Sequence, residues 1–193
     1  MEIELTRHPW ASLQGVSGDA RGLESAIRDL AGAKDRGTAL EASGRVERVI
    51  FAQGLLCEAS TAVAASLVHC LWRSAEHSED LILGLLSDLS AAVVNEEDPD
   101  VYGHASRERC MQEIVLAYPG YVEILETGSN VNSRTACIDL ILMCGIEFDY
   151  LRDRSIHYLE SALRLEGLDG HSAVIGDSLT DLREAGAQPG RSC

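Results

Sequence analysis

Proline placement constrains this chain more than any other feature of its sequence. The 193 residues include four prolines, Pro9, Pro99, Pro119 and Pro189. The long proline-free stretches 10–98 and 120–188 are rich in Leu and Ala, which lose little side-chain freedom in a helix. Because proline breaks a helix interior, these stretches can be helical throughout. We therefore predict an almost entirely α-helical protein.

Apolar side chains recur at the helical period along the chain. The predicted helices span about residues 19–33, 38–53, 57–72, 79–93, 105–117, 121–127, 130–144 and 148–164. Asp19 and Ser78 are expected to cap their helices, and either Asn130 or Asn132 caps the segment 130–144. That segment is apolar on nearly every side, so we expect it to lie between other helices. Residues 95–103 are charged and contain Pro99, which predicts an exposed loop.

The composition changes after residue 166. Residues 1–166 are predicted to form a single domain. Residues 167–193 contain five glycines and only a weak helical pattern near 179–185. Such a segment buries little apolar surface, so we expect a tail that is either disordered or loosely docked.

Cysteine usage and the N-terminus predict a cytoplasmic protein. Five of the six cysteines lie in apolar helical patterns and none forms a C-x-x-C pair, which indicates reduced core residues instead of disulfides or zinc ligands. The N-terminal segment lacks the basic and apolar regions of a signal peptide. No apolar run approaches the roughly 18 residues that a membrane span needs.

Charge argues against binding to nucleic acid or membranes. The chain has 16 Lys and Arg against 31 Asp and Glu, a net charge of −15. Between Ser74 and Ser106 lie eight acidic residues and no Lys or Arg. A phosphate backbone or an anionic lipid surface would be repelled. A basic protein partner would instead be attracted and would associate faster.

No motif gives a complete enzyme active site. Residues 173–180 resemble the nucleophile block of the GDSL esterases, but no His follows Ser178 to act as the base. The six histidines show no H-E-x-x-H or Glu-x-x-His spacing, and no glycine-rich loop carries a phosphate-binding lysine. We predict a non-enzymatic protein without catalytic residues, metal or cofactor. An enzyme with an unrecognised site is the alternative, and it would show a deep polar pocket with perturbed ionisable groups.

Helix pairs that repeat at about 35 to 45 residues are typical of helical-repeat solenoids. Residues 130–142 resemble the second half of a HEAT repeat, with Arg134 near the helix start, small residues after it and Leu or Ile at the packing positions. Residues 10–20, 52–54 and 58–63 are similar to short bacterial HEAT-like proteins, and the resemblance covers about residues 9–165. It implies an all-α, HEAT-like α-solenoid of stacked antiparallel helix pairs whose inner helices line a groove.

HEAT-like proteins act as scaffolds, bind cargo or, in some small acidic bacterial members, neutralise a cognate toxin. The resemblance and the charge together predict a protein-binding module, most specifically an immunity protein that binds and occludes a cognate bacterial toxin, one that is basic or acts on nucleic acid or nucleotides. The alternative is a structural scaffold or assembly adaptor, and a homodimer stays open. The predicted partner-binding residues are carboxylates on the 95–103 loop and on the polar face of the 148–164 helix: Glu96, Glu97, Asp98, Asp100, Asp149 and Asp153. For each loop acid, a merely solvated position is the competing interpretation.

Overall fold

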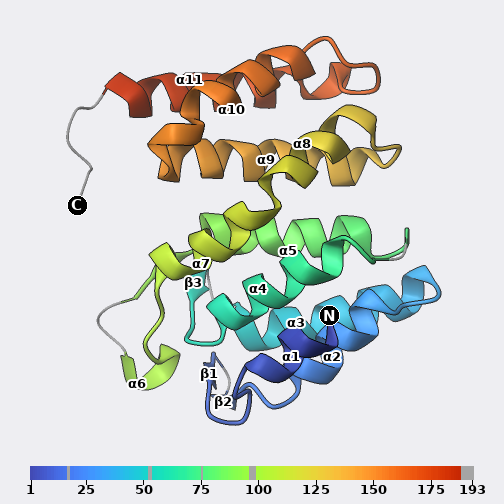
Figure 1. Cartoon of the computed structure of the whole chain (residues 1–193), viewed down its shortest axis with the longest axis vertical. Helices are drawn as coiled ribbons and strands as arrows, with labels where there is room; N and C mark the ends of the chain where they lie inside the picture. Colours follow the sequence, from blue (N-terminus) through green and yellow to red (C-terminus); the bar gives the residue numbers. More distant parts are fainter. Residues whose placement is uncertain (17, 52–53, 75, 96–98, 188–193) are drawn as a thin grey trace. The chain divides into compact units, whose positions relative to one another are not determined.

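The computed structural model describes residues 1–16, 18–51, 54–74, 76–95 and 99–187 (Figure 1). It is 72% helix and 4% strand, which confirms the all-α prediction. The chain forms two compact units, unit 1 over Met1–Leu116 and unit 2 over Ala117–Cys193. This division differs from the predicted single domain over residues 1–166 followed by a tail.

Unit 1 contains most of the helices and all of the described strands. Its elements are α1 (Glu2–Arg7), β1 (Gln14–Gly15), β2 (Gly18–Asp19), α2 (Leu23–Ala31), α3 (Arg36–Ile50), β3 (Leu55–Leu56), α4 (Ser60–Leu71), α5 (Glu79–Ala91), β4 (Val93–Val94), α6 (Pro99–Tyr102) and α7 (Arg107–Ile114). Strands β1 and β2 pair antiparallel, and β3 and β4 pair parallel. The sequence did not predict these strands because two residues are too short for an alternating pattern.

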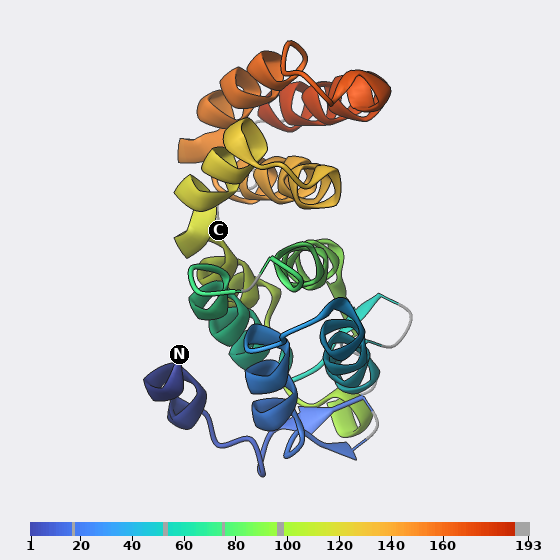
Figure 2. The same cartoon turned by 90° about the vertical axis from the view of Figure 1, so that its right-hand side faces the viewer.

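The helices of unit 1 pack in two layers. Helix α2 packs against α4, and α4 packs against α7, whereas α3 packs against α5. Figure 2 shows α3 and α5 on one side of the unit and α4 and α7 on the other. The core between the layers includes the buried side chains of Ile27, Leu30, Val46, Ile50, Val63, Leu67, Ile82, Leu86, Met111 and Ile114.

Polar caps set several helix starts that apolar periodicity placed differently. Helix α3 begins at Arg36 because Asp35 caps it: the Asp35 Oδ1 accepts the Thr38 backbone N–H at 2.8 Å. Asp19, predicted to cap the preceding helix, instead lies in β2 and accepts the Arg21 N–H at 3.1 Å. That helix, α2, therefore begins four residues later than predicted, at Leu23.

The Asp35 cap predicts a pH-dependent contribution to the stability of unit 1. Its hydrogen bonds from the Thr38 backbone and hydroxyl lower the pKa of Asp35 below the ordinary 3.8. A lowered native pKa stabilises the fold above the unfolded-state pKa, and this stabilisation disappears as pH falls through the native value. Urea unfolding should show Asp35→Ala less stable than the wild type at pH 7, with the difference vanishing in acid. A difference that is the same at pH 7 and in acid would contradict this account.

Unit 2 is built around helix α9. Its elements are α8 (Tyr118–Thr127), α9 (Val131–Glu147), α10 (Asp149–Ala162), the 3₁₀ helix η2 (Asp169–His171) and α11 (Ser172–Ala187). Helix α9 packs against α8, α10 and α11, which confirms that it lies between other helices. Asn130 caps it, since the Asn130 Oδ1 accepts the Asn132 N–H at 2.9 Å. The break predicted at residues 118–120 lies earlier, at the 3₁₀ helix η1 (Val115–Ala117), because Pro119 fits the first turn of α8.

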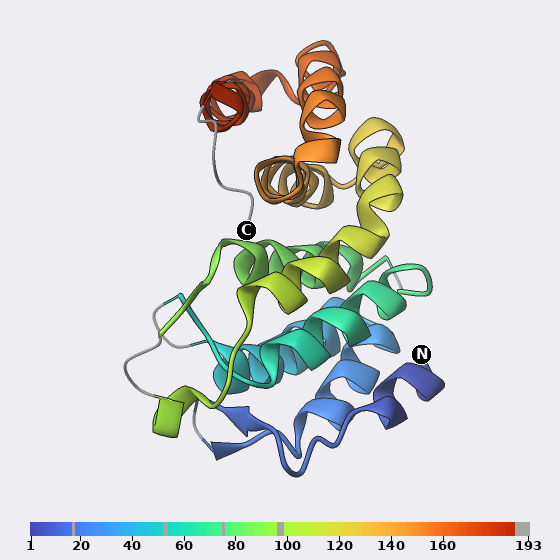
Figure 3. The same cartoon turned by 60° about the vertical axis from the view of Figure 1, so that its left-hand side comes forward.

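The structure differs most from the sequence prediction in the segment that was expected to be a tail, residues 167–193. Residues Ser172–Ala187 form helix α11, which packs against α9 and α10 (Figure 3). Ile175, Leu179 and Leu182 lie on one face of this helix and are buried. Burial of this apolar face outweighs the low helix propensity of the glycines, which had suggested a disordered or loosely docked segment.

The described cysteines are core residues, as predicted. Cys57, Cys70, Cys110, Cys137 and Cys144 are buried free thiols. Burial raises the pKa of Cys70 to about 11 and the pKa values of Cys110 and Cys144 to about 12. These thiols are therefore protonated near neutral pH and are poor nucleophiles. Among the described residues, no helix combines the length and apolar character required to cross a membrane.

Candidate partner-binding site

The predicted partner-binding acids fall into three groups. Glu96, Glu97 and Asp98 lie outside the described residues. Asp100 is exposed on α6 of unit 1, and Asp149 and Asp153 are exposed on α10 of unit 2. The candidate binding residues of unit 1 and of unit 2 are therefore described separately.

Asp100 sits on an anchored turn. The amide of Gln14 donates to the backbone oxygen of Val101 at 3.2 Å, and the Glu58 N–H donates to the Tyr102 oxygen at 2.7 Å. Gly103 follows with φ +67°, and a Cβ there would lie 2.7 Å from the Cβ of Glu58. Only glycine fits this close approach. The segment predicted as a loop thus contains a helical turn fixed to β1, with the Asp100 carboxylate exposed.

Asp149 is partly neutralised within its own helix. Its carboxylate forms an ion pair with Arg152, whose side chain is largely buried. Asp153 lies one turn after Asp149, so the two carboxylates share a face of α10. Asp153 is therefore the more available of the two acids for a partner.

Asp80, one of the acidic residues between Ser74 and Ser106, has a structural role. Asp80 is buried near the start of α5 and receives two hydrogen bonds from the Arg36 guanidinium, the Nη2–Oδ2 distance being 2.7 Å. Arg36 also donates to the backbone oxygen of His77 at 3.0 Å. This fork ties the start of α3 to the start of α5. Asp80 therefore does not add to the charge that a partner meets.

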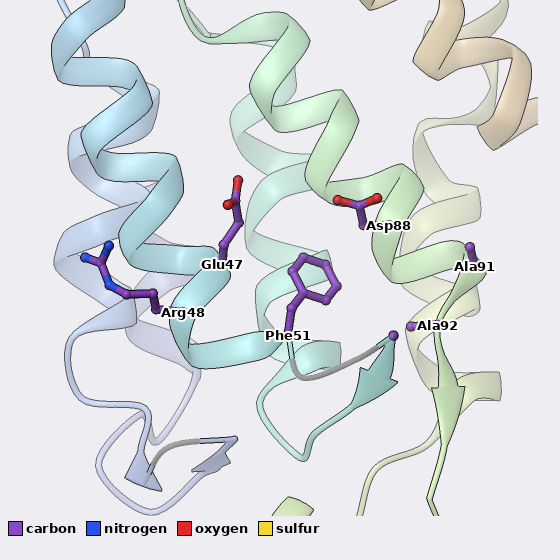
Figure 4. A pocket seen from close by; sticks show the side chains of 7 residues that line it. Glu47, Arg48, Phe51, Asp88, Ala91 and Ala92 are labelled. Carbon is purple, nitrogen blue, oxygen red and sulfur yellow. The ribbon is translucent and has the colours of Figure 1, made fainter.

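A surface hollow of about 550 Å³ lies between the C-terminal parts of α3 and α5, where the sequence analysis predicted no site (Figure 4). We refer to it as the α3–α5 hollow. It is lined by Glu47, Arg48, Phe51, Gly54, Asp88, Ala91 and Ala92. Two carboxylates, one aromatic ring and a small apolar wall therefore meet in one place.

Helical spacing and strand pairing position the residues of the α3–α5 hollow. Glu47 lies in the last turn of α3, and Phe51 follows the helix as its C-cap residue, whose N–H donates to the Glu47 backbone oxygen at 2.9 Å. Figure 4 shows the side chains of Glu47 and Asp88 on opposite sides of the hollow, with the Phe51 ring between them and Arg48 pointing away. At the base, the Val93 N–H donates to the Gly54 oxygen at 3.0 Å.

Glu47 in the α3–α5 hollow differs in its contacts from the acid Asp29 in a neighbouring hollow. Glu47 accepts a hydrogen bond from the Ser43 hydroxyl at 3.1 Å and forms no ion pair with any residue in the described ranges. By contrast, the hollow between α2 and α3 contains Arg45 and Asp29, which pair with each other at 2.7 Å. The α3–α5 hollow therefore presents a carboxylate that is open to an external cation.

The other sequence motifs have structural roles. Ser178 of the esterase-like segment lies inside α11, is buried, and donates its hydroxyl to the Val174 oxygen at 2.9 Å. It does not end a strand, so the esterase interpretation has no support from its position. Over the described ranges, no group of three or more His, Cys, Asp or Glu side chains could hold a metal ion.

The fold defines the class of the protein as an all-α protein of packed helix layers. Comparison with known proteins adds nothing to this class: no family model matches, and neither does any curated protein or solved structure. Sequence reasoning missed the α3–α5 hollow because the helix predicted over residues 38–53 includes Phe51, whereas α3 ends at Ile50. The half-buried ring instead lies beside Glu47, and their one-turn spacing was the available signal.

Proposed function

We propose that this chain is a non-enzymatic protein-binding module of the HEAT-like type. The arrangement of helices within each unit supports the proposal. In unit 1, α2 packs against α3 and α4 packs against α5, while the two pairs also contact each other through α2 with α4 and α3 with α5. In unit 2, α8 packs against α9, and α10 packs against α11. Stacked helix pairs of this kind present extended surfaces for other proteins.

The proposed partner is a protein with a basic surface. The observation that carries this choice is the excess of acid in the chain: a net charge of −15 together with the exposed carboxylates of Glu47, Asp100 and Asp153. An exposed ion pair contributes only about 0–1 kcal/mol, so no single acid would account for tight binding. The summed field instead raises the association rate with a complementary surface and disfavours neutral or acidic partners.

In its specific form, the proposal is an immunity protein that occludes the active site of a toxin. A toxin that acts on nucleic acid or nucleotides needs basic residues to hold its anionic substrate. Carboxylates of this chain would occupy those positions while the helices block access. Asp100, Asp153 and the α3–α5 hollow supply exposed carboxylates for this contact.

The proposal is tested by co-expressing the chain with the product of the adjacent reading frame. We expect the neighbour to slow growth, this chain to restore it, and the two to purify as a one-to-one complex whose association slows as salt is added. A neighbour that is harmless and does not bind would overturn the immunity form. Oligomers of this chain alone that persist at high salt would support the scaffold instead.

The loop acids give a sharper test of the same complex. Changing Glu96 and Glu97 to Gln and Asp98 and Asp100 to Asn should weaken binding and flatten its dependence on salt, because four attractive charges are removed. Surface plasmon resonance at several salt concentrations measures both effects. Unchanged affinity and an unchanged salt slope would exclude these four acids from the interface.

A further inference from the structure

We infer that two copies of this chain form a symmetric dimer through helices α10 and α11 of unit 2. The contact joins a basic and aromatic stripe on α10 of each copy to an acidic stripe on α11 of the other copy. This inference goes beyond the proposed function and does not depend on it, since Glu47 and Asp100 of unit 1 take no part in the contact.

The exposed face of α10 departs from the acidic character of the chain. Tyr150, Arg154 and His157 recur there at helical spacing, and Tyr150 is 71% exposed. Arg154 forms no ion pair with any residue that the structure describes, and exposed Arg164 follows just beyond the helix. Asp153 borders the stripe, but the two arginines outnumber it. Tyrosine and arginine are the residue types that most often anchor protein interfaces.

The exposed face of α11 has the opposite charge. Asp177, Asp181 and Glu184 follow one another at spacings of four and three residues, so they lie on one side of the helix. Over the described ranges, none of the three forms an ion pair. Like charges one turn apart repel each other and destabilise a helix. Cationic side chains supplied by a second copy would relieve this repulsion.

The stripes on α10 and α11 are level with each other along the helices. The two helices are joined by residues 163–171 and pack against each other (Figure 1). They run antiparallel, since a Cβ at Gly186 near the end of α11 would lie 3.2 Å from the Cδ of Arg152 near the start of α10. Counting equal steps along both helices from this contact places Arg154 level with Glu184.

A two-fold axis that lies between the helices and parallel to them turns this alignment into contact. Rotation by half a turn about such an axis places α10 of the second copy on α11 of the first, without a shift along the helices. Arg154 of each copy then meets Glu184 of the other, and His157 meets Asp181, which is level with it. Both pairs occur twice in the dimer, and each matches a donor with a carboxylate.

The same helix pair exposes apolar surface that a second copy would cover. Tyr150, Leu163 at the end of α10 and Val174 in α11 are each at least 43% exposed. Exposed apolar side chains rimmed by charged residues mark protein interfaces. The proposed contact therefore combines apolar burial with complementary charge.

The net charge of −15 on each copy opposes association but does not decide it. At an ionic strength of about 0.15 M, exposed charges more than about 8 Å apart are largely screened. The pairs in direct contact are screened less, so they determine whether two copies associate. Because exposed ion pairs are individually weak, we expect a reversible dimer that forms as concentration rises.

Charge exchange tests the dimer in sedimentation velocity of the full-length chain at about 0.15 M salt. Arg154→Glu and Glu184→Arg should each weaken self-association at least about tenfold, because the symmetry makes each substitution act twice. The double variant Arg154→Glu/Glu184→Arg should dimerise again. An equal mixture of the two single variants should form a heterodimer, in which every pair has opposite charges. Arg109→Glu, at an exposed position of unit 1, changes the net charge equally and is the control.

Three results would overturn the inference. The wild type could stay monomeric at the highest concentration measured, or the control could lose dimerisation as much as Arg154→Glu does. Single variants that do not recover the dimer when mixed would show that their loss came from another cause than the paired charges. If the adjacent gene product binds the wild type but not Arg154→Glu while the chain alone is monomeric, the stripe belongs to that partner instead.

Discussion

Replacing Arg134 with alanine should lower the free energy of unfolding of unit 2 by about 3 kcal/mol. The side chain is 7% exposed and lies near the start of α9. Its Nε donates to the Leu125 oxygen at 2.9 Å, and its Nη1 donates to the Glu166 oxygen at 2.8 Å. Leu125 is in the last turn of α8, where backbone oxygens have no partner within the helix. Alanine would leave both oxygens without these donors and would open a cavity.

Hydrogen exchange during urea titration measures this effect unit by unit. Amide protection in α8, α9 and the start of α11 should fall together, whereas protection in unit 1 should not change. Arg154→Ala is the matched control, since Arg154 is exposed on α10 and its replacement should change stability by no more than about 0.5 kcal/mol. An equal loss in both variants would show that the buried hydrogen bonds of Arg134 contribute little.

Arg134 also shows what the sequence can reveal. Its position near the start of a helix, followed by small residues, is visible in the sequence. The structure gives the physical reason for its burial, because its guanidinium joins the Leu125 oxygen in the last turn of α8 to the Glu166 oxygen after α10. Arg107 at the start of α7 has a comparable position in unit 1, where its Nη1 donates to the oxygens of Ser90 and Ala92 at 2.8 and 2.9 Å.

Periodicity predicted most helices correctly because apolar side chains must lie on the buried face wherever the helix begins. Their ends were less predictable, because a cap such as Asp35 acts through local hydrogen bonds to Thr38 that leave no periodic signal. Helix α11 was missed for another reason. Its glycines lower local propensity, while the burial of Ile175 and Leu182 depends on α9 and α10, which lie elsewhere in the chain.

The sequence indicated that exposed acidic residues would be available for a partner, but it did not indicate where on the fold a surface hollow would form. Net charge indicated an acidic binding surface, and the structure describes exposed acids such as Asp100 and Asp153. The α3–α5 hollow could not be read from spacing, because Glu47 and Asp88 meet only when α3 packs against α5. A surface hollow of this kind depends on tertiary packing.

Gly145→Ala should destabilise unit 2 by about 2 kcal/mol, although alanine is the better helix former. A Cβ at this position of α9 would lie 2.6 Å from the Ser155 Oγ and 2.7 Å from the Leu182 Cδ2. Ser155 cannot move freely, because its hydroxyl donates to the Ile141 oxygen at 3.0 Å and lies 2.8 Å from the buried Tyr118 hydroxyl. The added methyl group would therefore separate α10 and α11 from α9 or break this hydrogen-bond network.

Gly176→Ala makes the same chemical change in the same unit and should have the opposite effect. Gly176 lies inside α11, and a Cβ there would meet no atom within 4 Å. Alanine should raise the free energy of unfolding by about 0.5–1 kcal/mol through higher helix propensity and lower unfolded-state entropy. Urea unfolding of the two variants side by side tests the sign of each change. If both substitutions were stabilising, α10 and α11 would have to pack against α9 more loosely than the contacts of Gly145 require.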